Sequence, residues 1–299
     1  MSTFVLLTLT GFGLAAMYFL IASGLSLIYG LMGVLNFAHG AFITVGAYGT
    51  WWSSVHVFDG VHSDLWRWLA SSAVGLICGG IFAALVELLL IRPLYSRHIE
   101  QVLVTVGLQL AFVALVTGVW GPDPQTFVVP AWLHETTDVG GALIPNDRWV
   151  EIATAAAVLG LLQLFLRKTR YGLIIRAGVE NRAMVQALGI DVRKAFTLVF
   201  AIGGIAAAVA GVLGGVYFNS IQPDQGTSLL IFAFIVVVIG GLGSIGGSAV
   251  AACLVGLVQQ YTNYYASSGI GDMVVVLLLG VVLLARPRGL AGAVVGARA

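Results

Sequence analysis

Charged residues are scarce in this sequence. Only 9% of the 299 residues are charged, with 14 basic and 13 acidic side chains, whereas ordinary soluble domains carry about 25%. Because this small number of charges cannot cover a water-soluble surface, the surface has to face lipid. Residues 1–58 and 225–271 contain no Asp, Glu, Lys or Arg. Because one span needs about 20 apolar residues, each stretch can hold two spans, and the sequence predicts an all-α, polytopic membrane bundle.

Cysteine is scarce too. Cys78 and Cys253 both lie in apolar segments, so we expect neither a structural disulfide nor a metal site. No Ser/His cluster, carboxylate pair or His-rich set suggests an intramembrane enzyme, and nothing indicates a cofactor or nucleic acid. The opening MSTFVLL has no basic region and no clear cleavage site, which predicts a retained first helix instead of a signal peptide.

The apolar pattern predicts nine membrane segments in one domain. Eight spans plus one re-entrant segment would also fit the pattern. The predicted segments are 4–30, 37–56, 67–91, 100–120, 149–166, 196–218, 227–242, 245–265 and 271–286.

The distribution of charge predicts the orientation. With the N-terminus outside and nine spans, 12 of the 14 basic residues fall in cytoplasmic connections or in a cytoplasmic C-terminal tail, as the positive-inside rule requires. The loop 121–148 then forms an irregular external cap, and 167–195 becomes the main cytoplasmic loop. No soluble domain is evident, so a transporter driven by ATP would need its motor from another chain.

Polar residues interrupt the first apolar run. Asn36 and His39 lie three residues apart and are followed by Gly40. Polar groups inside a membrane are costly and tend to face a cavity or a partner helix, and glycines tolerate a broken helix whose backbone lines a pathway. Hydrogen bonding across a helix interface explains the same residues equally well.

A second glycine-rich motif covers residues 240–247. Residues 241–246 match the dinucleotide pattern G-x-G-x-x-G, but neither a strand nor the acidic residue needed about 20 positions later is present. A tight turn between two membrane segments explains the motif better. We assign Gly241, Gly243 and Ser244, with Asn36, His39 and Gly40, to a predicted substrate pathway.

The basic loop 167–195 contains an amphipathic stretch at 174–188. Its residues recur at helical spacing and end at a glycine. The stretch could lie on anionic lipid headgroups or dock on a cytoplasmic partner. The residues assigned to this contact are Arg176, Ala177, Glu180, Arg182, Met184, Leu188 and Gly189.

Four stretches carry a family resemblance. YGLMGVLNFAHGAF (29–42), RPLYSR (92–97), the stretch 169–196 and VVVIGGLGSIGG (236–247) together resemble the LivH branch of the branched-chain amino-acid ABC transporter permeases. The resemblance implies one permease domain, 1–299, in a bacterial cell membrane, with no chemistry of its own. It also implies a second, LivM-like permease, two cytoplasmic ATP-binding subunits and an extracytoplasmic binding protein. The stretch 174–188 would then be the coupling helix that docks on an ATPase.

The resemblance leaves the substrate open. Similar permeases serve branched-chain amino acids, urea and short amides. From another class, an ion-coupled secondary transporter or channel would need ionisable groups inside the membrane. Only His39 and Glu87 qualify here. Glu87 is near the end of its segment, and we expect it to pair with the neighbouring Arg92.

Overall fold

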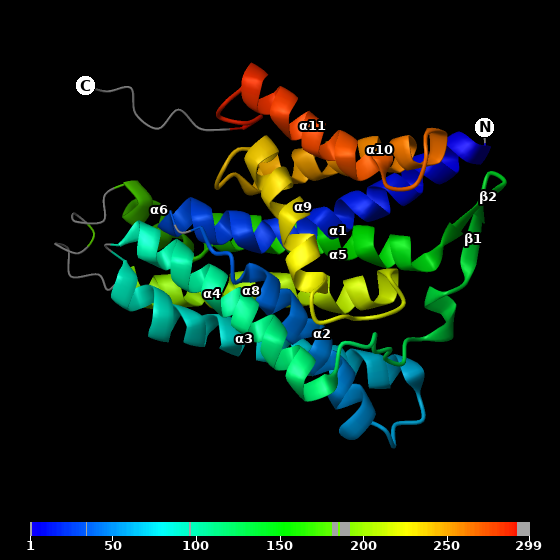
Figure 1. Ribbon diagram of the computed structural model, residues 1–299, viewed down its shortest axis with the longest axis horizontal. Helices are drawn as coiled ribbons and strands as arrows, with labels where there is room; N and C mark the ends of the chain where they lie inside the picture. Colours follow the sequence, from blue (N-terminus) through cyan, green and yellow to red (C-terminus); the bar gives the residue numbers. More distant parts are fainter. Residues whose placement is uncertain (1, 34, 96, 181–184, 186–191, 292–299) are drawn as a thin grey trace.

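The computed structural model describes residues 2–33, 35–95, 97–180, 185 and 192–291, and it is almost entirely helical (Figure 1). Each of the nine predicted segments coincides with a helix, with ends that differ by a few residues. These helices are α1 (Ser2–Met32), α2 (His39–His56), α3 (Asp64–Val86), α4 (His98–Trp120), α5 (Asn146–Lys168), α8 (Val192–Tyr217), α9 (Gln225–Gly240), α10 (Ile245–Tyr265) and α11 (Ile270–Ala285).

In the described part of the chain, six helices are long and apolar enough to cross a membrane: α1, α3 with its extension to Leu94, α4, α5, α8 and α10. The shorter α9 and α11 have 16 residues each. A further helix, α6 (Arg170–Glu180), covers the beginning of the predicted amphipathic stretch. The predicted all-α membrane bundle is therefore confirmed.

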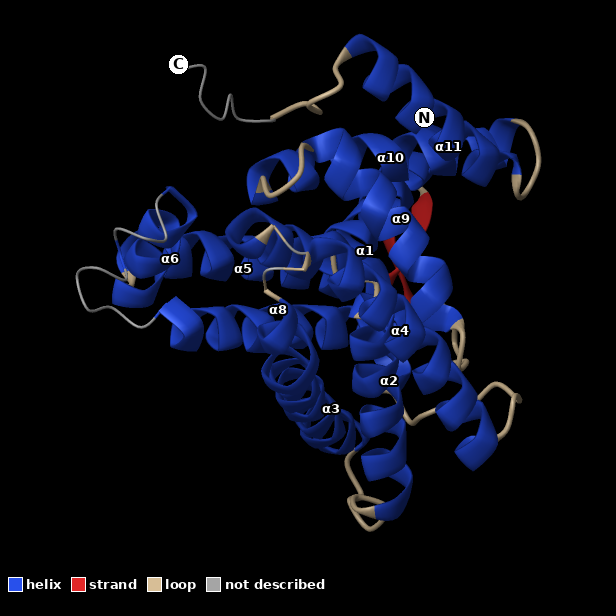
Figure 2. Ribbon diagram, turned by 60° about the vertical axis from the view of Figure 1, so that its left-hand side comes forward, coloured by secondary structure: helices blue, strands red, loops and turns tan. Residues whose placement is uncertain are grey.

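Helices α1 and α8 run in opposite directions through the centre of the bundle (Figures 1 and 2). Their backbones touch where Gly24 meets Gly203, and α8 also packs closely on α3, where Gly79 meets Ala208. Without a hydrophobic driving force in lipid, helices associate through such small-residue contacts. The small-residue spacings in α3 and α8 are therefore packing signals.

Two four-helix units, α1–α4 and α8–α11, repeat with inverted direction. Helix α1 packs on α9 and α10, as α8 packs on α2 and α3. In each unit the long first helix is followed by a break and a short helix. A residue with positive φ, Gly33 or Asn219, lies six positions before that short helix begins. Inverted repeats with broken helices are a recurrent plan of membrane transporters.

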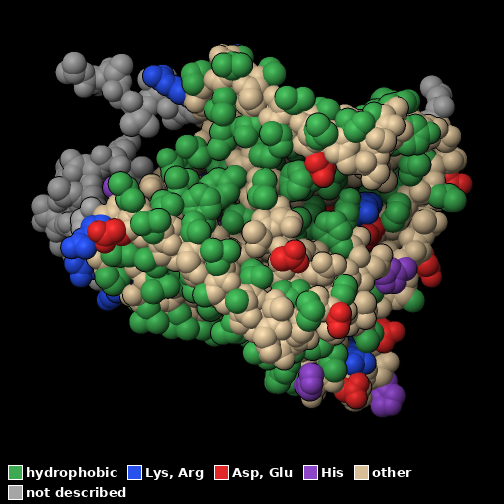
Figure 3. Space-filling model, in the orientation of Figure 1, with side chains coloured by type: hydrophobic (Ala, Val, Ile, Leu, Met, Phe, Trp, Pro, Cys, Tyr) green, Lys and Arg blue, Asp and Glu red, His purple; other side chains and the backbone are tan. Residues whose placement is uncertain are grey.

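Charge is segregated along the long axis of the molecule. The side chains near α6 and the end of α11 are basic, and the opposite end gathers acidic and histidine side chains (Figure 3). Helix α1 begins at the acidic end and α11 runs toward the basic end (Figure 1).

The loop 121–148 is more regular than predicted. It contains a short 3₁₀ helix, Ala131–Leu133, and a hairpin of β1 (Thr136–Val139) and β2 (Ala142–Pro145), whose strands stand out in Figure 2. Gly140 and Gly141 both have positive φ, as a two-residue type I′ turn requires. The Gly-Gly pair was the sequence signal for this hairpin.

Candidate functional site

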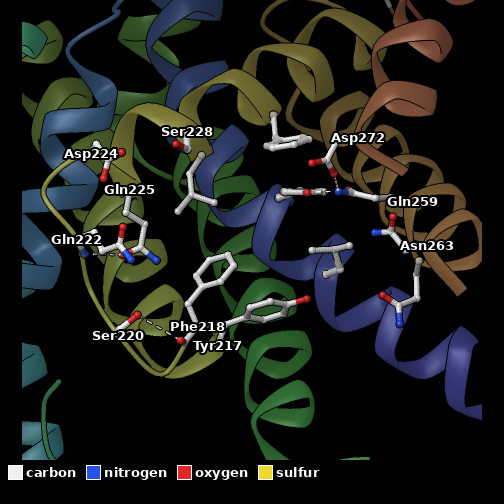
Figure 4. A pocket seen from close by; sticks show the side chains of 15 residues that line it. Tyr217, Phe218, Ser220, Gln222, Asp224, Gln225, Ser228, Gln259, Asn263 and Asp272 are labelled. Atoms are coloured by element: carbon white, nitrogen blue, oxygen red, sulfur yellow. Dashed lines mark hydrogen bonds between the residues drawn. The ribbon is translucent and has the colours of Figure 1, made fainter. Parts of the chain in front are cut away.

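A cavity of about 560 Å³ opens between α1, α9, α10 and α11 (Figure 4). Ligand pockets typically measure 300–1,000 Å³ and combine an apolar lining with a few convergent polar groups. The apolar lining comes from Leu14, Tyr18, Tyr217, Phe218, Leu229 and Phe232. The polar lining comes from Ser220, Gln222, Asp224, Gln225, Ser228, Gln259, Gln260, Asn263 and Asp272.

A hydrogen-bonded chain holds one wall of the cavity in place. The Tyr18 hydroxyl donates to Oε1 of Gln259 (2.7 Å), and Nε2 of Gln259 donates to Oδ1 of Asp272 (2.6 Å). Gln259 is buried, with 5% of its surface exposed. Because both ends of this amide are bonded, the chain fixes the Asp272 carboxylate at the cavity rim.

The opposite wall is the break between α8 and α9. The backbones of Ile221 and Gln125 exchange two hydrogen bonds, of 2.8 and 2.9 Å, so the break is tied to the 121–148 loop. Beside it, the Arg148 guanidinium lies 3.5 Å from the centre of the Tyr217 ring. Arg148 also pairs with Asp147 and Glu151, so its charge is neutralised behind the cavity wall.

The two short helices meet where each begins. Gly40, the second residue of α2, is in contact with Gly226, the second residue of α9, and a Cβ on Gly40 would lie 2.7 Å from the Gly226 carbonyl oxygen. Gln109 of α4 closes this junction by donating to Thr227 Oγ1 (2.8 Å), while its own Oε1 is buried and has no partner in the part of the chain that the structure describes. Within the described residues, no part of α2 lines the cavity, because α9 lies between them.

The structure places Asn36 and His39 beside this junction. Both are fully buried. Oδ1 of Asn36 accepts from the Ala38 backbone N–H (3.1 Å), and Nε2 of His39 lies 3.1 Å from the Ile21 carbonyl oxygen. Nδ2 of Asn36 and Nδ1 of His39 have no partner among the described residues. Their assignment to a substrate pathway stays a prediction.

The glycine-rich motif is a tight turn between α9 and α10, as the sequence indicated. Gly241 and Gly243 have positive φ, and a Cβ on Gly30 of α1 would lie 2.6 Å from the Gly243 Cα. This contact joins two of the four stretches that carry the family resemblance. Ser244 caps α10, because its Oγ accepts from the Gly247 backbone N–H at 3.0 Å.

Replacing Ser244 by Ala should lower stability by about 1 kcal/mol, because it removes the N-cap bond of α10. The thermal unfolding midpoint of the purified protein in detergent would measure the loss. Ser244→Asp, which keeps an acceptor at the cap, is the matched control. Equal midpoints for Ser244→Ala and the unsubstituted protein would contradict a capping role.

The predicted coupling residues lie at the basic end. Arg176 is exposed on α6 and its Nε donates to the Gly172 carbonyl (3.4 Å), whereas Ala177 packs against Val185 and Phe196. Glu180 is the last residue of α6. Arg182, Met184, Leu188 and Gly189 lie outside the described residues.

Glu87 anchors a buried polar cluster next to α6 and α8. It begins a π-helical turn, Glu87–Ile91, and is fully buried. Arg92 donates to both carboxylate oxygens at 3.2 Å, and the Thr197 hydroxyl of α8 donates to Oε2 at 2.8 Å. The Tyr95 hydroxyl donates to Oε1. The expected Glu87–Arg92 pair is confirmed, and it joins α3 to α8.

Sequence reasoning missed the cavity. Gln259, Asn263 and Asp272 lie inside the predicted segments 245–265 and 271–286 and match no motif. One signal was available for Gln259: it is a polar residue inside a membrane-length helix, as are Asn36 and His39, and such residues tend to face a cavity or a partner.

Inverted repeats, a broken helix in each repeat and a polar cavity beside the second break are features of membrane transport proteins. The chain belongs to the family described as "Branched-chain amino acid transport system / permease component", which it matches over residues 7–285. The resemblance seen in the sequence is therefore confirmed, and the protein is a multi-pass membrane permease subunit.

Three curated relatives show the extent of the similarity. The high-affinity branched-chain amino acid transport system permease protein LivH of Salmonella typhimurium is 30% identical over 94% of this chain and 93% of its own length. The corresponding permease protein BraD of Pseudomonas aeruginosa is 29% identical over 94% of each chain. A probable LivH of Methanocaldococcus jannaschii is 27% identical over 91% of this chain and 88% of its own. No solved structure matches the chain.

Proposed function

We propose that this chain is a permease subunit of an ATP-driven importer for branched-chain amino acids. Family membership supports this function most directly, because the curated relatives are branched-chain amino acid permeases over nearly their whole length. In this proposal a second, LivM-like permease completes the membrane core, two ATP-binding subunits drive it, and an extracytoplasmic binding protein delivers the solute. The lipid bilayer surrounds the bundle.

Charge segregation supports an orientation in the bacterial cell membrane. The basic end, with α6 and the end of α11, would face the cytoplasm, and the N-terminus and the 136–145 hairpin would lie outside. The cavity between α9 and α11 would then receive solute from the external side. Asn36, His39, Gly40, Gly241, Gly243 and Ser244 would border the path further inward, once α2 and α9 separate.

The exposed surface of α6 supports docking on an ATPase. Tyr171 and Leu173 are 48% and 62% exposed beside the exposed Arg176. A groove of about 360 Å³ lies between Tyr171 and the beginning of α8, and Thr197 of the Glu87 cluster lines it. A helix of the partner that docked in this groove would contact Thr197, which is hydrogen-bonded to Glu87 at the end of α3. ATP binding would then shift the populations of two permease conformations through α6, α3 and α8.

Reconstitution tests the proposed function. The permease pair, the ATPases and the binding protein are placed in liposomes, and uptake of radiolabelled leucine is followed with ATP or with a non-hydrolysable analogue. We expect uptake with ATP but not with the analogue, and we expect a proton ionophore to leave this uptake unchanged. Uptake by this chain without ATPases would instead indicate a channel or an ion-coupled carrier.

Replacing Arg176 or Glu180 by Ala should uncouple ATP hydrolysis from uptake. We expect leucine uptake to fall at least tenfold while the ATPase rate and the yield of folded complex are kept, because α6 would lose its contacts to the motor. Arg97→Ala, which changes an exposed charge at the same end, is the matched control. Unchanged uptake in both α6 variants would contradict the docking role.

A further inference from the structure

The cavity between α9 and α11 carries negative charge without a basic counterpart. Asp224 and Asp272 are its charged lining residues, and no Lys, Arg or His of the described part of the chain lines it. Among the described residues, neither carboxylate forms a salt bridge, and Arg148 behind Tyr217 is neutralised by its own acidic partners. A cleft of one charge sign within low-dielectric walls concentrates the field and attracts ions of opposite charge.

Asp272 is the better placed of the two carboxylates for recognition. Gln259, which is held by Tyr18, donates to Oδ1 of Asp272 and so orients the Asp272 carboxylate. Figure 4 shows Asp272, Gln259 and Asn263 on one side of the cavity and the Asp224, Gln225 and Ser228 group on the other. An ammonium group offers three donors for carboxylate and amide oxygens, and the apolar lining nearby suits an alkyl side chain.

We infer that this cavity binds the ammonium group of a small amino acid at Asp272, with the apolar side chain against Leu14, Leu229 and Phe232. Gln259 is a positioning residue that acts through Asp272. This inference rests on the proposed function and makes it more specific, because it gives the permease its own preference for ammonium-bearing solutes. Urea and short amides carry no ammonium group, so they lack the charge–charge attraction to the two carboxylates.

Thiol labelling tests the cavity charge without any need for transport. Ser228→Cys is introduced after Cys78 and Cys253 are replaced by Ala, and the intact complex is labelled without binding protein. The probes are a cationic methanethiosulfonate (trimethylammonium-ethyl) and an anionic one (sulfonatoethyl). We expect the cationic reagent to react faster relative to its rate with free thiol. Asp272→Asn should lower that rate ratio several-fold, because it removes one of the two carboxylates that attract the cationic reagent and repel the anionic one.

Protection from labelling identifies the recognised group. Leucine and isopentylamine at millimolar concentration should slow labelling, whereas 4-methylpentanoate and urea should not. Gln259→Ala should weaken protection by leucine while it leaves the reagent ratio intact, since the carboxylate remains. Asp64→Asn, in the first turn of α3 outside the cavity, is the control and should change neither measurement.

An unchanged reagent ratio in Asp272→Asn, or equal protection by 4-methylpentanoate and isopentylamine, would overturn the inference. If Ser228→Cys fails to fold, Ser220→Cys on the same wall provides the second labelling position. If the labelling results contradict the inference but leucine uptake depends on ATP, only the assignment of the cavity is wrong. If labelling follows the expected pattern but uptake does not depend on ATP, only the proposed importer function is wrong.

Discussion

Replacing Gly226 by Ala should lower the stability of the permease by about 1–3 kcal/mol, the usual cost of forcing an extra methyl group into a packed site. The added Cβ would overlap the Gly40 carbonyl oxygen and approach Thr44 Oγ1 at 2.5 Å. Backbone lies directly opposite, so no side chain can rotate away, and α2 and α9 would have to move apart. Uptake should fall together with stability, because the junction of α2 and α9 joins the two repeats.

The thermal unfolding midpoint in detergent would measure the effect of Gly226→Ala. Gly280→Ala in α11 is the matched control, because a Cβ there meets nothing within 4 Å. Since Ala is favoured over Gly in helices by about 1 kcal/mol, the control should be as stable as the unsubstituted protein or slightly more so. If Gly226→Ala behaves like Gly280→Ala, the close approach of α2 and α9 is wrong.

Replacing Arg92 by Met should cost about 3 kcal/mol, because it leaves the fully buried Glu87 carboxylate without its cation. Arg92 itself is 31% exposed, so we place the loss at the lower end of the 3–5 kcal/mol found for broken buried pairs. The hydrogen bonds from Tyr95 and Thr197 remain, but neutral donors do not replace a guanidinium that bonds both oxygens.

The double variant Glu87→Gln with Arg92→Met should recover much of that loss, since no buried charge is left. Arg97→Met is the control for removal of a cation, because the Arg97–Glu100 pair is 64% and 49% exposed, and such pairs contribute at most about 1 kcal/mol. The measurement compares the thermal unfolding midpoints of the unsubstituted protein, Arg92→Met, the double variant and Arg97→Met. A loss for Arg92→Met no larger than that for Arg97→Met would show that Glu87 is not held as a buried ion.

The sequence predicted the helices well, because lipid imposes long apolar runs. It also predicted the turn at Gly241 and Gly243 and the Glu87–Arg92 pair, which depend on residues near one another in the chain. The junction at Gly40 and Gly226 and the bond from Gln259 to Asp272 were beyond it. These depend on how distant helices cross, and local spacing carries no information on that crossing.

The repeated architecture has a consequence for the second conformation of the protein. The α8–α11 unit is open at the cavity, while the matching space in α1–α4 is packed shut around Gln101, Thr105 and Gln109 of α4, which are almost fully buried. Two units of like architecture can exchange arrangements. If the α1–α4 unit opened as the α8–α11 unit closed, these three polar side chains would be exposed to water at the basic end. The open arrangement of the α8–α11 unit thus indicates which residues of the α1–α4 unit would line the pathway in that second conformation.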